Sequence, residues 1–146
     1  MGKIVISTNV SLDGVVQDPD GEEGFRLGGW FGQFGAEDLE QWAKVSLEEA
    51  KWSNSTVLTG DVVSEVSKLK QELDGDIVVY ASYQLGRTLI EHDLVDELRL
   101  VVFPVVLGAG ERLFTETSEK KPMRLLDTKT IGDGLVLLTY EMVQAA

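Results

Sequence analysis

The hydrophobic pattern divides the chain into short apolar runs separated by polar turns. Apolar and β-branched residues dominate three of these runs, at 3–9, 76–80 and 97–103. The first run continues through residues 10–16 into a turn marked by Asp13-Gly14. Runs of this composition predict the buried strands of a sheet.

The last third of the chain carries the clearest signal for a hairpin. Residues 123–131 and 135–142 alternate between apolar and polar positions, and Gly132-Asp133-Gly134 separates them. This arrangement predicts two antiparallel strands joined by a tight turn. A further short strand is predicted at 56–59.

Helical spacing recurs in three segments. One helix is predicted at 36–43, and a second begins after Asp61 as its N-cap and runs from Val62 to about Leu73. Its predicted buried stripe consists of Val62, Val63, Val66, Leu69 and Leu73, while Ser64, Glu65, Lys68 and Lys70 are expected to face water.

The third helix is predicted to follow Ser82, which stands at the N-cap position. Leu85, Leu89 and Ile90 recur behind it at helical spacing, and the helix is expected to end near His92.

Strands that alternate with helices predict an α/β fold with right-handed parallel crossovers. The expected sheet is mixed, parallel in the middle with an antiparallel C-terminal hairpin, and helices cover both faces. Residues 1–146 are predicted to form a single domain.

Two glycine-rich segments interrupt this pattern. Residues 17–35 also carry Phe25, Trp30, Phe31 and Phe34, and such aromatics either plug the edge of a core or wall a pocket. The second segment, 104–110, follows the strand that ends at Phe103.

Composition narrows the functional classes. The chain has 25 acidic and 13 basic residues, a formal net charge of −12 and no cysteine. This charge disfavours binding to nucleic acids and to anionic membranes. High solubility is the simpler explanation of such a charge. No signal peptide or membrane span is apparent, so a cytoplasmic protein is expected.

Ligands of parallel crossovers collect where strands end and helices begin, because free backbone N–H groups and the helix dipole point there. Tyr80, Ala81, Ser82, Tyr83 and Gln84 occupy that place and are candidates to hold a phosphate.

Two further candidates are ionic. Asp13 could bind a substrate amine or relay a proton, although a turn residue before glycine is its commoner role. Arg112, in the loop Gly108–Arg112, could meet an anion, or could pair with one of the many surface acids.

No self-sufficient catalytic set is present. His92 is the only histidine, which excludes multi-histidine metal sites, and its place at a helix end flanked by acids indicates a solvated cap. We predict no metal site. Chemistry would therefore have to come from a bound cofactor.

Three stretches carry a resemblance to a known family. KIVISTNVSLDGVV, the middle GDIVVYASYQLGRTLIEHDLVDELRLVVFPVVLGAGERLF and the closing hairpin together resemble bacterial dihydrofolate-reductase-like proteins. These are similar to the C-terminal reductase domain of the bifunctional riboflavin-biosynthesis deaminase-reductase. Compared with that pattern, the chain is shortened between Gly35 and Trp52, and it has Ala81-Ser82 where a glycine pair is usual.

The resemblance implies an NADPH-dependent, commonly homodimeric reductase that transfers hydride to a small pteridine- or pyrimidine-like substrate. It implies a cofactor site made by Tyr80, Ala81, Ser82, Tyr83, Gln84, Leu85 and Gly60. It implies a substrate site made by Asn9, Asp13, Trp30, Pro104 and Gly108, with Asp13 also the catalytic candidate.

A second hypothesis remains open. The chain could be a non-catalytic ligand-binding or dimerisation module that keeps the fold but lacks part of the cofactor site. That hypothesis expects an apolar self-complementary surface including Val101, Phe103 and Val105.

Overall fold

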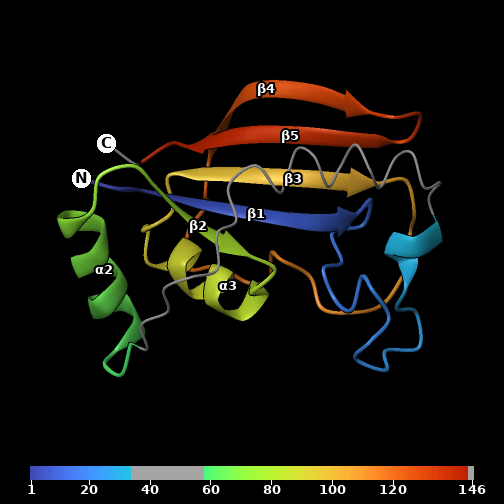
Figure 1. The fold of residues 1–146 in the computed structure, drawn as a ribbon, viewed down its shortest axis with the longest axis horizontal. Helices are drawn as coiled ribbons and strands as arrows, with labels where there is room; N and C mark the ends of the chain where they lie inside the picture. Colours follow the sequence, from blue (N-terminus) through green and yellow to red (C-terminus); the bar gives the residue numbers. More distant parts are fainter. Residues whose placement is uncertain (34–57, 145–146) are drawn as a thin grey trace.

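The computed structural model describes residues 1–33 and 58–144, which form one mixed five-stranded sheet with helices packed against it (Figure 1). The elements are β1 (Lys3–Ser11), the short 3-10 helix η1 (Trp30–Gln33), α2 (Val62–Glu72), β2 (Asp76–Tyr80), α3 (Tyr83–Glu91), β3 (Glu97–Phe103), β4 (Met123–Ile131) and β5 (Leu135–Met142).

The first strand of the chain lies inside the sheet, whose order is β2-β1-β3-β5-β4. β1 pairs in parallel with both neighbours, β2 and β3. β5 then pairs antiparallel with β3 and with β4. The mixed sheet with its C-terminal hairpin is therefore confirmed, and the crossover through α3 passes from β2 over β1 to β3.

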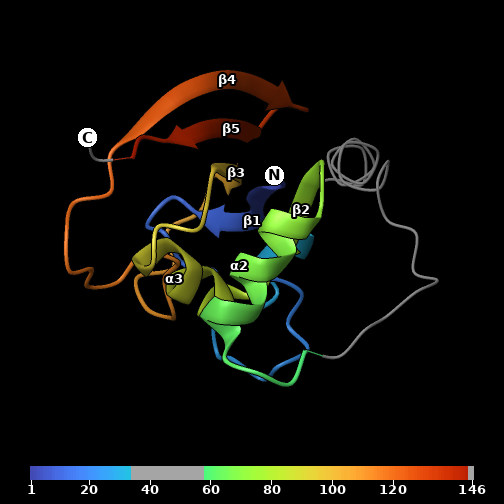
Figure 2. The same ribbon diagram turned by 90° about the vertical axis from the view of Figure 1, so that its left-hand side faces the viewer.

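One face of the sheet is covered by both described α-helices (Figure 2). α3 contributes Leu89 and Ile90, which are 1% and 3% exposed. They pack in one core with Ile4, Ile6 and Leu98 of β1 and β3. Helices were expected on both faces. The predicted helix at 36–43 lies outside the described residues. Of the strand predicted at 56–59, residues 56 and 57 also lie outside them, and residues 58 and 59 form no strand.

α2 begins as predicted but packs differently. Asp61 caps it by accepting a hydrogen bond from the Ser64 N–H at 3.0 Å. None of its residues is buried, and Val62 at the first position is 46% exposed. The predicted buried stripe was therefore wrong at the ends of the helix, and Val66 is the stripe residue that packs against the core.

A polar contact holds the C-terminal end of α2 instead. Lys70, which was expected to face water, has a side chain only 12% exposed. Its Nζ donates to Asp96 Oδ2 at 2.6 Å and to the Leu94 carbonyl at 3.1 Å. The same Asp96 oxygen accepts from the Ile4 N–H at 2.8 Å, so one carboxylate joins α2, β1 and the turn before β3.

The opposite face of the sheet has a second, smaller core. Trp30 of η1 is fully buried there, and its ring meets Phe103 edge-to-face at 5.3 Å between centroids. Val101 is buried in the same cluster. Neither described α-helix is long and apolar enough to span a membrane.

Ion pairs join the amino-terminal ends of the three parallel strands on this face. Glu97 of β3 is 4% exposed and pairs with both Lys3 of β1 and Arg99 of its own strand. Arg99 reaches Asp76 of β2 at 3.3 Å. Burial raises the pKa of Glu97, but its two cationic partners outweigh burial and the net pKa is lowered.

Candidate functional site

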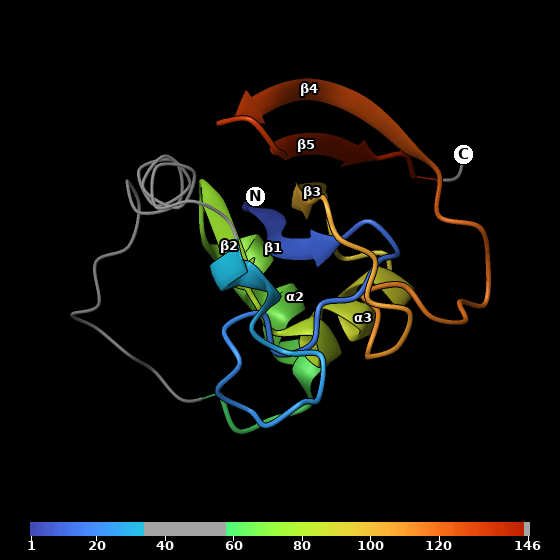
Figure 3. The same ribbon diagram turned by 90° about the vertical axis from the view of Figure 1, so that its right-hand side faces the viewer.

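The carboxyl ends of β1, β2 and β3 meet at one edge of the sheet (Figure 3). The turn after β1, the turn from β2 into α3 and the glycine-rich loop after β3 all start there. This edge brings together most of the residues that the sequence proposed as a site, because parallel neighbouring strands end on the same side.

The turn from β2 into α3 is exposed and conformationally unusual. Ala81 has a φ of 54°, in the left-handed region that residues with a Cβ seldom occupy. Ser82 stands at the N-cap position as predicted, but its side chain makes no capping hydrogen bond. The first N–H groups of α3 therefore receive no cap from Ser82, and donors at a helix start are suited to bind a ligand.

The first turn of α3 divides its side chains between core and solvent. Leu85 packs against the core under the sheet, so only its backbone can serve a ligand. Gln84 is exposed, and Tyr83 lies under the guanidinium of Arg87 at 5.1 Å from the ring centroid. Tyr80, just before the turn, is 46% exposed.

Asp13 connects two of the loops at this edge. Its Oδ1 accepts from the Ser11 hydroxyl at 2.6 Å and from the Leu107 N–H at 3.1 Å, and its Oδ2 accepts from the Gly108 N–H at 2.8 Å. The Ser11 hydroxyl and these N–H groups outweigh burial and lower the pKa of Asp13 to about 2. The side chain is thus an engaged carboxylate at neutral pH.

Side chains also hold the rest of the glycine-rich loop. Arg112 did pair with an acid, because its Nε donates to the Asp13 carbonyl at 3.0 Å and its Nη2 lies 3.8 Å from the carboxylate. Arg87 of α3 donates to the Arg112 carbonyl and pairs with Glu111 at 2.9 Å. Both arginines are therefore engaged with protein groups.

Among the predicted substrate residues, Pro104 and Gly108 are exposed at this edge. Asn9 is half-buried on β1 opposite Val101, on the face away from the helices. Trp30 is fully buried, and its Nε1 donates to the Gln17 carbonyl at 3.0 Å. Of the two interpretations of this aromatic loop, the core plug is the one that the structure shows for Trp30.

Gly60 lies in the bend before α2. The C-terminal end of α2 hydrogen-bonds to the start of β1, through the Gly2 N–H and the Lys70 carbonyl, and Gly60 lies at the other end of this helix (Figure 1). A Cβ at Gly60 would come within 2.7 Å of Glu65 Oε1, so its neighbour is the side chain of its own helix start.

Asp18 organises the loop before η1, a role that its sequence context did not predict. It is 2% exposed and accepts hydrogen bonds from the N–H groups of Glu23 and Phe25, each at 3.0 Å. These donors, with Glu23 the largest contributor, outweigh burial and lower the pKa of Asp18. The only sequence signal is its place in Asp18-Pro19-Asp20-Gly21, which is typical of any turn.

Comparison with known proteins assigns this arrangement to a family. Residues 34–137 match the family described as the RibD C-terminal domain. The chain belongs to this family. The expected resemblance is confirmed, and the α/β fold of the dihydrofolate-reductase type is confirmed with it.

Solved structures share the fold of this RibD C-terminal domain at low identity. A putative riboflavin biosynthesis protein from Shewanella sp. PV-4 aligns with a TM-score of 0.65 at 17% identity, covering 97% of this chain and 99% of that one. A deaminase/5-amino-6-(5-phosphoribosylamino)uracil reductase of Thermotoga maritima aligns with a TM-score of 0.59 at 10% identity, covering 97% of this chain and 57% of that one.

A sequence relative has higher identity over a shorter stretch. The uncharacterized protein YyaP of Bacillus subtilis (strain 168) is 36% identical over 88 residues, which is 60% of this chain and 47% of that protein. The match thus spans about half the length of YyaP. The family supports a reductase-like domain as the general class.

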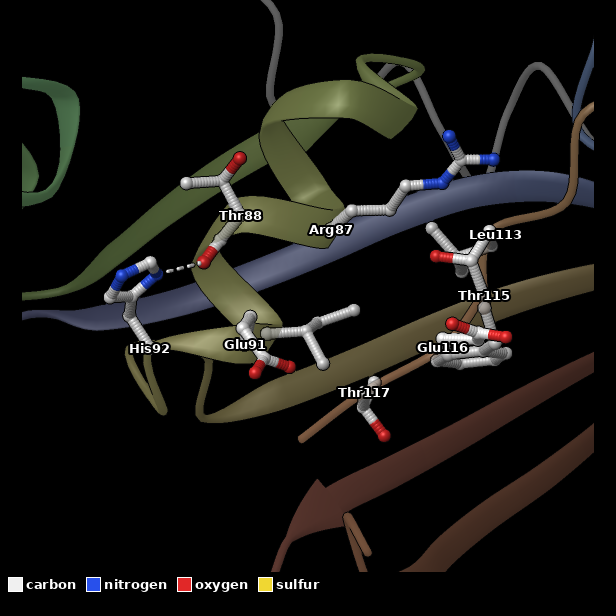
Figure 4. A pocket seen from close by; sticks show the side chains of 10 residues that line it. Arg87, Thr88, Glu91, His92, Leu113, Thr115, Glu116 and Thr117 are labelled. Atoms are coloured by element: carbon white, nitrogen blue, oxygen red, sulfur yellow. Dashed lines mark hydrogen bonds between the residues drawn. The ribbon is translucent and has the colours of Figure 1, made fainter. Parts of the chain in front are cut away.

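A separate cavity of about 260 Å³ lies beside α3, away from the helix start (Figure 4). It lies between the C-terminal half of this helix and residues 113–117. Several polar groups on its wall are already paired. Glu91 accepts from the Ser118 N–H at 3.1 Å, and His92 Nδ1 lies 2.8 Å from the Thr88 carbonyl oxygen, as expected for a cap. The cavity and the edge of the sheet are therefore different places in this RibD C-terminal domain.

The described residues contain no cluster of three or more His, Cys, Asp or Glu that could hold a metal ion. Where the pKa of a described carboxyl group departs from its ordinary value, it is lowered. The described side chains can therefore orient a ligand, hydrogen-bond and carry charge, while the electron chemistry of a reductase would fall to a cofactor.

Proposed function

We propose that this RibD C-terminal domain is an NADPH-dependent reductase that transfers hydride to a small heterocyclic substrate, pteridine- or pyrimidine-like, in the cytoplasm. The observation that carries the proposal is the start of α3, which lies at the carboxyl edge of the sheet and is not capped by Ser82. The glycine-rich loop that also begins at this edge is held by Asp13. Exposed backbone donors at a helix start favour a diphosphate, even in a chain with a net charge of −12.

The residues at this edge fit the cofactor in kind. The turn at Ala81 and Ser82 and the first N–H groups of α3 would hold the diphosphate, with Tyr80 exposed next to them. When bound, the nicotinamide supplies the hydride. The chain's own residues have the remaining tasks of orienting the two rings and excluding water.

The charged side chains at this edge fit a role in orienting the ligands rather than in transferring protons. Asp13 is ionised at neutral pH and has no proton to donate. Arg87 and Arg112 are both paired with acids, so they stabilise the glycine-rich loop and do not shuttle protons. We therefore assign the proton that accompanies hydride transfer to solvent.

Titration with NADPH, followed by quenching of tryptophan fluorescence, tests the proposal. Saturable binding is expected, and NADH in the same assay decides between the two nicotinamides. Ser82→Asp is expected to abolish binding without loss of thermal stability, because an aspartate there caps α3 and repels a diphosphate. Thr130→Asp, which adds the same charge at an exposed position on β4, serves as control.

A non-catalytic ligand-binding or dimerisation module is the second candidate. It is favoured by the absence, among the described carboxyl groups, of one whose pKa is raised toward neutrality, as a general acid requires. Wild-type protein that shows no quenching at millimolar NADPH, together with a normal thermal transition, would reject the reductase and leave this candidate.

We also propose a homodimer, with a contact surface different from the one first expected. Val101 and Phe103 are buried within the chain against Trp30 and cannot serve a partner. Leu125 and Leu126 of β4, in contrast, are 51% and 48% exposed at an irregular step of an edge strand. Light scattering should give twice the 16.0 kDa chain mass, and Leu125→Lys with Leu126→Lys should give monomers.

A further inference from the structure

We infer that Asp13 is a positioning residue that fastens the glycine-rich loop to the end of β1, and that the loop so held presents Val106 beside Leu12 as an apolar wall of the site. The inference deepens the proposed reductase, and only its cofactor-binding part rests on that proposal. It gives Asp13 a role different from the proton relay that its place in the sequence suggested.

The Asp13 carboxylate contacts a loop that lies far along the chain. Asp13 uses both oxygens, and two of its donors are backbone N–H groups 94 and 95 residues further along the chain. Its side chain is 21% exposed. A turn aspartate that served only its own turn would have no partners in a distant loop, so the carboxylate joins two segments that otherwise end separately.

Other contacts position the rest of the loop but not its tip. The Gln17 Oε1 accepts from the Glu111 N–H at 3.0 Å, and Arg87 holds residues 111 and 112. At Leu107 and Gly108, the side-chain acceptor is Asp13. Removing this carboxylate would therefore release the tip while the base of the loop stays held.

The chemistry of the group also fits positioning. A carboxylate that accepts from two N–H groups would lose acceptor capacity on protonation, so holding the loop requires the ionised form. The lowered pKa of Asp13 means that this form is present throughout the neutral range. A proton donor at neutral pH needs the opposite shift.

The held segment carries an exposed apolar pair. Leu12 is 61% exposed and Val106 is 68% exposed. Their segments are adjacent, since the Leu12 N–H donates to the Val105 carbonyl at 2.9 Å. Two exposed apolar side chains on adjacent segments of this edge are suited to the flat face of a heterocyclic ring, here the nicotinamide of the proposed cofactor.

Hydrogen exchange of the peptide that spans residues 105–110, measured by mass spectrometry, tests the fastening directly. Asp13→Asn should raise its exchange about tenfold, because the loss of one ionic hydrogen-bond acceptor has this order of effect on local opening. Asp13→Glu, which keeps the charge on a longer arm, should give an intermediate rate. Asp127→Asn, the same change at an exposed position on β4, should leave exchange unchanged.

NADPH titration of the same proteins supplies the second readout. Asp13→Asn should weaken binding, and Val106→Ser should weaken it while exchange of residues 105–110 stays as in wild type, because the wall is altered but not released. If Val106 only supported the fold, its replacement would be expected to change hydrogen exchange of residues 105–110 together with NADPH binding.

The outcomes are distinguishable. Unchanged exchange in Asp13→Asn, or in Asp13→Glu if the asparagine variant does not fold, would overturn the positioning role. Unchanged NADPH affinity in Val106→Ser, with wild type binding normally, would overturn the apolar wall. Failure of wild type to bind NADPH would reject the proposed function, while the exchange measurement would still decide the role of Asp13.

Discussion

Ala81 shows how a single backbone angle can affect stability and binding. Among the residues that the structure describes, its φ of 54° is one of three positive values outside glycine, and the other two belong to aspartates, which tolerate this region better. Ala81→Gly should raise the free energy of unfolding by about 0.5–1 kcal/mol, since relief of the left-handed conformation exceeds the entropy that glycine adds to the unfolded chain. Urea denaturation measures the change.

Ala109→Gly provides the matched control for this prediction. Ala109 lies in an exposed loop and has no positive φ. The same substitution there should therefore lower stability slightly, by a few tenths of a kcal/mol up to about 1. Equal effects of the two substitutions would mean that the conformation of Ala81 is not strained.

At the residue scale, the sequence predicted turns and their candidate residues but not the contacts that these residues make. The turn at Asp13 was predicted, but its partners at residues 107 and 108 could not be, because the pairing depends on how two loops close in space. Trp30 had two possible roles, and its contact with Phe103 on the same face of the sheet decides for the core.

Asp18 organises a whole segment at the scale of one element. Its carboxylate sits inside the loop that leads to η1, and its own carbonyl accepts from the N–H groups of Gly21 and Gly29. A Cβ at Gly28 would approach Asp18 Oδ2 to 2.4 Å, so the loop closes tightly around the carboxylate. This loop ends at Trp30, which links its order to the second core.

Asp18→Asn should therefore loosen the loop and expose Trp30. Asparagine offers one acceptor oxygen in place of two, so one of the N–H groups of Glu23 and Phe25 loses its partner. With Trp42 and Trp52 replaced by phenylalanine, the emission of Trp30 should shift to longer wavelength. Asp20→Asn, on the exposed neighbour, is the control and should leave the spectrum as it is.

The contact between Lys70 and Asp96 predicts how firmly α2 is held. Lys70→Met should lower the free energy of unfolding by about 1–3 kcal/mol, because a largely buried charged hydrogen bond is lost. Lys68→Met, which removes a 65% exposed lysine paired with Glu65, should change it by less than about 0.5 kcal/mol. Urea titrations of both variants give the comparison, and similar losses would contradict a special role for Lys70.

Elements were easier to predict than their packing. The bounds of β2, β3, β4 and β5 agree with the β-branched and alternating runs, since local composition and turn glycines determine where strands begin and end. The stripe of α2 was wrong because periodicity predicts an apolar face but not the depth to which a neighbour covers it.

For the whole molecule, lowered carboxyl pKa values predict acid sensitivity. Asp13, Asp18 and Glu97 bind protons less readily in the folded protein than in the unfolded chain. Their contribution to stability is therefore complete above their ordinary pKa values, which lie near 4, and is lost as the pH falls below them; for Asp13 the loss continues to its folded pKa of about 2. Urea midpoints should be level between about pH 6 and 7 and drop steeply between about pH 5 and 3.

A variant with Asp13→Asn and Asp18→Asn tests the source of this acid sensitivity. This variant should be less stable than wild type at pH 7. On acidification, its free energy of unfolding should fall by less than that of wild type, because two of the responsible groups no longer titrate. A parallel decline of both proteins would assign the sensitivity to other carboxylates.

The central position of β1 has a consequence for how the chain folds during synthesis. Both strands that pair with it arrive much later, at residues 76–80 and 97–103. A nascent chain therefore carries Ile4, Val5 and Ile6 without the strands that the structure shows beside them until residues 76–103 have been synthesised. Non-local pairing of this kind slows folding and lengthens exposure to aggregation. Chains arrested before residue 97 should accordingly depend on a holding chaperone, whereas chains released after residue 103 can bury their first strand.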